Sequence, residues 1–151
     1  MMTVNKPKHA TNLEPILSFR LAEQYYALAI DNVLEVVAMM SLSTIPNAPN
    51  ALIGIANRRG EALAMLDLRI AFHLEASAPD ISTLFIVAQT KKIRVGLVVD
   101  EIFQVKYIHR DAIQATQNAG HYITHIISHN NVLYQQINLD TLISEYLAPI
   151  N

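Results

Sequence analysis

The sequence contains no cysteine and only four glycines among its 151 residues. Without thiols, the chain cannot form a disulfide, a thiolate metal site or a cysteine nucleophile. Charged residues are also few, at 16% with a net charge of −2, which gives the chain no general attraction for nucleic acid. No stretch reaches the ~18 consecutive apolar residues that a membrane-spanning helix needs. The high apolar content, 52%, is therefore assigned to a protein core and to surfaces for partners.

The two ends of the chain differ from its middle. Residues 1–14 are polar and lack the apolar segment of a signal peptide, so we interpret them as a loose N-terminal arm of a cytoplasmic protein. Residues 15–147 are expected to form the folded domain, and residues 148–151 a short C-terminal tail.

Apolar runs rich in β-branched residues come in pairs along the domain, each pair separated by a short polar turn. The pairs are 16–21 with 24–30, 50–58 with 61–66, 82–90 with 93–100, and 121–129 with 132–139. Each pair predicts a β-hairpin. Two short helices are predicted, over 68–74 with Asp67 as the cap and over 141–147 with Asn138 or Asp140 as the cap, because a side-chain oxygen there can accept first-turn N–H groups.

A weak internal repeat is the most informative pattern in the sequence. Residues 29–37 resemble residues 98–106, and residues 54–68 align without a gap with residues 125–139. Two matching blocks at similar spacing predict two similar β-rich halves. We expect two small barrels that share one core, because closing a sheet removes its exposed edges.

The repeat also serves as an internal control for the adjacent Arg58 and Arg59. The second copy has His129 and Asn130 at these positions, so the turn itself does not require arginine. For Arg58, a solvated turn residue remains one of the open interpretations. Arg59 has an acidic candidate partner in Glu35, and we expect the two to form a partly shielded ion pair.

Three other kinds of site are weighed against these residues. His121, His125 and His129 recur every four residues, but their neighbours favour a strand, on which successive histidines lie ~13 Å apart and cannot share a metal ion. A phosphate site at Arg58 and Arg59 would need more glycine. No nucleophile elbow or metalloprotease helix is present, yet a stand-alone ligand-binding or hydrolytic β-barrel protein remains the alternative from another functional class.

Several motifs follow one another in the first half and at the start of the second. Their residues are Val33, Glu35, Val36, Pro46, Pro49, Gly54, Asn57, Arg59, Gly60, Asp67, Leu68 and Arg69, followed by the segment 95–105. In this order they resemble the CheW-like domain family of bacterial chemosensory arrays. The resemblance covers about residues 15–147. Arg58, Ala64 and His125 depart from the usual pattern.

The resemblance implies a mostly-β fold of two intertwined five-stranded SH3-like β-barrels with short flanking helices. The barrels would span roughly residues 29–82 and 83–138, with strands exchanged between them. It also implies a protein without catalytic activity, cofactor or metal.

By the same resemblance, the protein is an adaptor that couples the cytoplasmic tip of a chemoreceptor to the regulatory domain of a CheA-type histidine kinase. It would be cytoplasmic, associated with membrane-bound receptor arrays but not inserted in the membrane. An adaptor of a twitching-pilus or other non-flagellar chemosensory pathway is the alternative. The implied partner-binding residues are Val33, Glu35, Val36, Asn57, Arg59, Leu84, Val99 and Val105.

Overall fold

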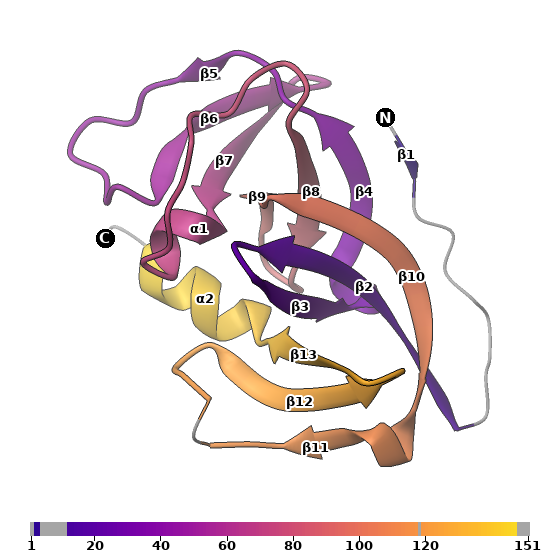
Figure 1. Cartoon of the computed structure of the whole chain (residues 1–151). Helices are drawn as coiled ribbons and strands as arrows, with labels where there is room; N and C mark the ends of the chain where they lie inside the picture. The colour runs from indigo at the N-terminus through magenta and orange to yellow at the C-terminus, as the bar shows by residue number, and fades with distance from the viewer. Residues whose placement is uncertain (1, 4–11, 118, 148–151) are drawn as a thin grey trace.

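Two β-sheets make up most of the computed structural model, which describes residues 2–3, 12–117 and 119–147 (Figure 1). The first sheet has the strand order β1-β4-β8-β9-β7-β6-β5. Its strands are β1 (Met2–Thr3), β4 (Val33–Ala38), β5 (Leu42–Ser43), β6 (Leu52–Arg58), β7 (Glu61–Asp67), β8 (Leu84–Gln89) and β9 (Arg94–Val98). Neighbouring strands are antiparallel except β7 and β9, which are parallel.

The second sheet has the strand order β10-β2-β3-β13-β12-β11. Its strands are β2 (Leu13–Leu21), β3 (Gln24–Ala29), β10 (Glu101–His109), β11 (Ile113–Ala115), β12 (Ile123–His129) and β13 (Val132–Ile137). Its one parallel pair is β13 with β3. Apart from β1, the two sheets therefore match strand for strand, and the N-terminal hairpin β2–β3 completes the sheet of the second half. The predicted hairpins are all present.

The sequence repeat reappears as repeated irregularities in strand pairing. The register shifts lie between Val33 and Glu35 in β4 and between Ile102 and Val105 in β10, and again between Leu52 and Gly54 in β6 and between Ile123 and His125 in β12. Leu52 and Gly54 align with Ile123 and His125, and Val33 aligns with Ile102, whereas the shift in β10 ends at Val105, one residue beyond the equivalent of Glu35. The predicted duplication is thus confirmed at the level of the backbone, because bulges are specific local features of a strand.

Three hydrophobic clusters fill the described part of the molecule. The largest draws side chains from both sheets and from both α-helices, among them Phe19, Val36, Leu97 and Leu142. A second cluster belongs to the first sheet alone, and a third, around Ile127, to the second sheet alone. This division into one shared core and two local cores is compatible with two barrels packed together.

Short helices follow equivalent strands in the two halves. The helix α1 (Leu68–Ala71) begins after Asp67, whose side chain accepts a hydrogen bond from the Arg69 N–H, and α2 (Leu139–Tyr146) begins after Asn138, which caps the Thr141 N–H. Both helices and the Asp67 cap are confirmed, but α1 ends at Ala71, before the expected residue 74, and α2 begins at Leu139, before the expected residue 141. Of the two residues proposed to cap α2, the structure uses Asn138. Two single turns of 3₁₀ helix, η1 (Ile30–Asn32) and η2 (Arg110–Ala112), precede β4 and β11. Among the residues described, no helix combines the length and apolarity needed to cross a membrane.

The N-terminal region differs from the loose arm expected over residues 1–14. Met2 and Thr3 form β1 and pair with β4, while Leu13 and Glu14 already belong to β2. The pairing was not predicted because two residues carry no periodic pattern. The expected C-terminal tail, 148–151, lies outside the described residues.

Candidate functional site

The turn between β6 and β7 presents the motif arginines. Asn57 accepts a hydrogen bond from the Gly60 N–H through its side-chain oxygen at 3.0 Å, and the two central residues, Arg59 and Gly60, have φ of 52° and 79°. In the second half, Asn130 and Asn131 adopt φ of 50° and 63° at these positions. Asparagine and glycine suit such hairpin turns, whereas arginine is disfavoured at positive φ. Arg59 therefore stands against the local preference of its turn, as residues kept for function often do.

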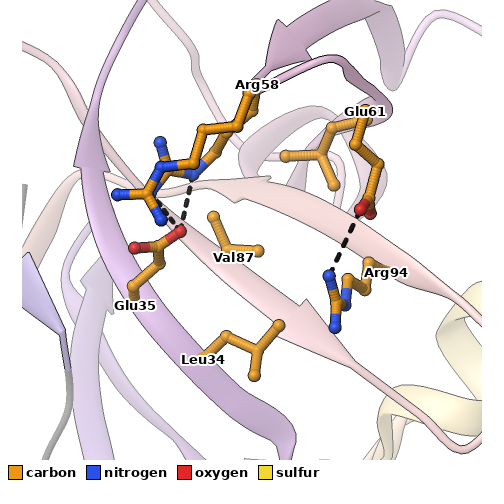
Figure 2. A pocket seen from close by; sticks show the side chains of 8 residues that line it. Leu34, Glu35, Arg58, Glu61, Val87 and Arg94 are labelled. Atoms are coloured by element: carbon orange, nitrogen blue, oxygen red, sulfur yellow. Dashed lines mark hydrogen bonds and ion pairs between the residues drawn. The ribbon is translucent and has the colours of Figure 1, made fainter.

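Glu35 forms its ion pair with Arg58 (Figure 2). The side chains are only 14% and 12% exposed, respectively, so the pair is largely shielded. Glu35 therefore has a shielded partner in Arg58, and the solvated interpretation of Arg58 is wrong. The physical reason is strand alternation: Arg58 ends β6 on the same face as Ala56, which is buried in the cluster of the first sheet. The ion pair expected between Glu35 and Arg59 stays a prediction.

This ion pair lies at one end of a small pocket of about 120 Å³ on the first sheet. The lining residues are Leu34, Glu35, Arg58, Arg59, Glu61, Leu63, Val87 and Arg94. A second, half-exposed ion pair joins Arg94 to Glu61 at 3.2 Å, and Leu34 and Val87 lie between the two pairs (Figure 2). Drug-sized ligands occupy pockets of about 300–1,000 Å³. The dimensions therefore suit a side chain from another protein better than a free metabolite.

The equivalent place in the second half is filled differently. The sequence repeat aligns Leu34 with Phe103, and strand register aligns Leu63 with Tyr134 and Arg94 with Tyr25. The ring of Tyr25 lies 5.8 Å from that of Phe103 and 5.9 Å from that of Tyr134, centroid to centroid. The duplicated scaffold thus carries an aromatic cluster in one copy and a charged pocket in the other.

The remaining residues implied for partner binding fall into two groups. Val33, Val36 and Val99 are at most 3% exposed and belong to the shared core, so their side chains support the surface from beneath. Leu84 is 45% exposed, and Val105 is partly buried against the shared core. The structure therefore does not place all eight residues on one surface.

A buried arginine was missed as an organising residue by sequence reasoning. Arg69 holds both carboxylate oxygens of Asp67, through Nε at 3.0 Å and Nη2 at 2.9 Å, and reaches Asp100 through Nη1 at 3.2 Å. Asp100 also accepts the backbone N–H of Ala22 at 2.7 Å, in the turn between β2 and β3. These contacts connect the two sheets, and the hydrogen bonds to Asp67 raise the pKa of the Arg69 guanidinium above its ordinary value. The signal in the sequence was an arginine two residues after a strand-ending aspartate.

Among the described residues, the three histidines His121, His125 and His129 do not form a metal site. His125 and His129 lie on β12, as the strand interpretation predicted, with one ring nitrogen of His125 2.9 Å from the Thr124 hydroxyl. The described residues contain no group of three or more His, Cys, Asp or Glu side chains that could hold a metal ion.

The chain is similar in sequence to known proteins of one family. Residues 15–146 match the model of the CheW-like domain. The chain is 31% identical over 113 residues to the chemotaxis protein CheW of Rhizobium meliloti, covering 74% of this chain and 73% of the relative. It is 26% identical over 118 residues to the chemotaxis protein CheW of Helicobacter pylori, covering 76% and 72%.

A solved structure gives the same result in three dimensions. The crystal structure of the scaffolding protein TtCheW from Thermoanaerobacter tengcongensis superimposes with a TM-score of 0.78 at 26% identity, over 83% of this chain and 89% of that one. The structural similarity and the family match thus agree, and the structural similarity includes the two-sheet architecture. The chain therefore belongs to the CheW-like domain family.

Proposed function

We propose that this protein is a chemotaxis-type adaptor that couples chemoreceptors to a CheA-type histidine kinase, without catalysis of its own. The family match, the relatives named chemotaxis protein CheW and the similarity to a CheW scaffolding protein support this function. In this role it works at membrane-bound receptor arrays through its partners, the receptor tip and the regulatory domain of the kinase.

The observation that carries the proposal is the charged pocket present in the first half and replaced by aromatic rings in the second. A helical receptor tip offers an apolar stripe and scattered charges, and such helices bind aliphatic surfaces flanked by a few polar anchors. Leu34 and Leu84 supply aliphatic area on the first sheet. Arg59 supplies a planar guanidinium that can hold a carboxylate through two hydrogen bonds.

Within the pocket, the two arginines have different roles. Arg58 neutralises Glu35 in a shielded position and so maintains the site. Arg59 is exposed at the tip of the turn and contacts the partner. The proposed contact surface comprises Glu35, Asn57, Arg59, Leu84 and Val105, underlain by Val33, Val36 and Val99.

Co-sedimentation with receptor-bearing membranes and kinase tests the proposal. We expect Arg59→Ala to weaken receptor binding by about tenfold or more, because a partner's carboxylate loses its charged partner on docking. Arg110→Ala is the matched control, since Arg110 is another exposed arginine, paired with Glu14 at 2.9 Å in the second half. Failure of the unaltered protein to sediment with receptors and kinase would reject the adaptor function. A parallel loss of thermal stability and binding in Arg59→Ala would instead reject the docking role of Arg59.

A further inference from the structure

The outer edge of β4 is covered by the chain's own N-terminal residues. Met2 lies opposite Val36 and Thr3 opposite Glu35 in an antiparallel pair (Figure 1). The strand thus covered carries the carboxylate that pairs with Arg58. The N-terminal strand therefore runs alongside the proposed partner site.

The second sheet shows that the fold does not require such a cover. Its strand β10 occupies the position equivalent to β4 and pairs with β2 on one side. In the part of the chain that the structure describes, no strand pairs with the other side of β10. The cover on β4 is consequently a particular feature of the first half. While β1 is paired, the backbone edge of β4 at Glu35 and Val36 is occupied and is not accessible to another protein.

The contacts of β1 indicate that it is held weakly. The pairing with β4 extends over two residues, whereas β4 and β8 pair over five positions. Both side chains of β1 are exposed, that of Met2 by 54%, and neither belongs to a hydrophobic cluster. With little apolar area buried, only backbone pairing holds the segment against its loss of conformational freedom. Such a strand opens easily.

We propose that β1 competes with the receptor for the edge of β4. In the free protein this edge pairs with Met2–Thr3, and it contacts the receptor when β1 is displaced. This regulation rests on the proposed function, because it concerns access to the same surface. A binding surface that is covered for part of the time shows a weakened apparent affinity, in proportion to the uncovered fraction. If β1 covers the edge for half to nine-tenths of the time, its removal strengthens binding about two- to tenfold.

The test compares three proteins of 151 residues with one shortened protein. The first is unaltered, the second carries Met2→Pro and Thr3→Pro, and the third carries Met2→Val and Thr3→Val. Proline lacks the N–H that a strand ladder needs, whereas valine favours strands. The fourth protein begins at Asn12. Dissociation constants are measured for a soluble chemoreceptor tip fragment, and hydrogen exchange is measured at the amides of Glu35 and Val36 in each free protein.

We expect the proline and truncated proteins to bind about two- to tenfold more tightly and to exchange faster at the outward amide of this pair, and the valine protein to change in the opposite direction. Equal affinities in all four proteins would overturn competition by β1. Weaker binding after truncation would overturn it too, because β1 would then belong to the receptor's contact surface. If none of the four binds the fragment while all remain folded, the proposed receptor function itself fails, and the competition falls with it.

Discussion

Replacing Arg69 by methionine tests the network that joins the two sheets. The Arg69 side chain is 5% exposed and that of Asp67 only 1%, so the substitution leaves a carboxylate buried without its guanidinium partner. The variant also loses the hydrogen bond from Arg69 Nη2 to the Ser77 carbonyl, at 2.8 Å, and the contact with Asp100. Methionine retains most of the apolar volume of arginine, so the measured effect reports mainly on charge and hydrogen bonding.

The expected cost follows from the burial of this pair. Removing one partner of a buried ion pair costs about 3–5 kcal/mol, a large part of the roughly 5–15 kcal/mol that stabilises a typical domain. For a chain of this size, each kcal/mol lowers the melting temperature by about 2–4 °C, which gives a decrease of about 6–20 °C for Arg69→Met. Arg94→Met is the matched control, because the Arg94–Glu61 pair is half exposed, at 50% and 52%. An exposed pair contributes about 0–1 kcal/mol, so the control should melt within about 4 °C of the unaltered protein.

Thermal unfolding followed by circular dichroism, with urea unfolding as a second measurement, compares the variants. A double variant, Arg69→Met with Asp67→Asn, also removes the negative charge of the buried Asp67 carboxylate. The amide oxygen of the new asparagine can still cap α1. We expect this double variant to recover part of the lost stability. The reasoning would be refuted if Arg69→Met melted like Arg94→Met, or if the double variant were no more stable than Arg69→Met alone.

Three further predictions concern single residues. Arg59→Asn should leave stability within about 1 kcal/mol of the unaltered protein, because asparagine suits positive φ as Asn130 does in the second half, yet should weaken receptor binding. Thermal unfolding and the dissociation constant are the measurements, and a parallel loss of stability and binding would contradict the docking role of Arg59. Asn138→Ala should cost about 1 kcal/mol by removing the cap of α2, measured by urea unfolding, and no loss would show that the cap is not needed. Gly54→Ala should cost about 1–3 kcal/mol, since its new Cβ would lie 2.8 Å from the Cβ of Leu42, and faster amide exchange in β5 should accompany the loss; unchanged exchange and stability would contradict the predicted clash.

The local architecture was predictable because local chemistry encodes it. Alternating apolar runs with short polar turns located the hairpins, and side-chain oxygens at Asp67, and at Asn138 or Asp140, indicated the starts of the helices. The repeat predicted the duplication because both copies keep the same strand positions and the same turn. Within the candidate site, it showed that Arg58 and Arg59 lie where the second half has no arginine.

The pairing partner of Glu35 was not predictable in the same way. Two adjacent arginines are equally near in sequence, and the shielded contact of Arg58 with Glu35 depends on its place at the end of β6, on the face of Ala56. That depends in turn on the register shift in β4 between Val33 and Glu35, which sets the direction of the carboxylate. A shift of one residue reverses the faces of a strand, and the sequence pattern alone does not specify it.

By itself, the sequence determined a mostly-β chain with two related halves, the places of its turns and caps, and the family to which it is similar, because these depend on residue periodicity and local backbone preferences. Only the tertiary structure decided that Arg58 shields Glu35, that Val33, Val36 and Val99 lie in the core, that Arg69 joins the sheets, and that Met2–Thr3 covers β4. These features depend on which strands, distant in sequence, become neighbours and in what register, since burial and charge pairing arise only when the chain is closed on itself.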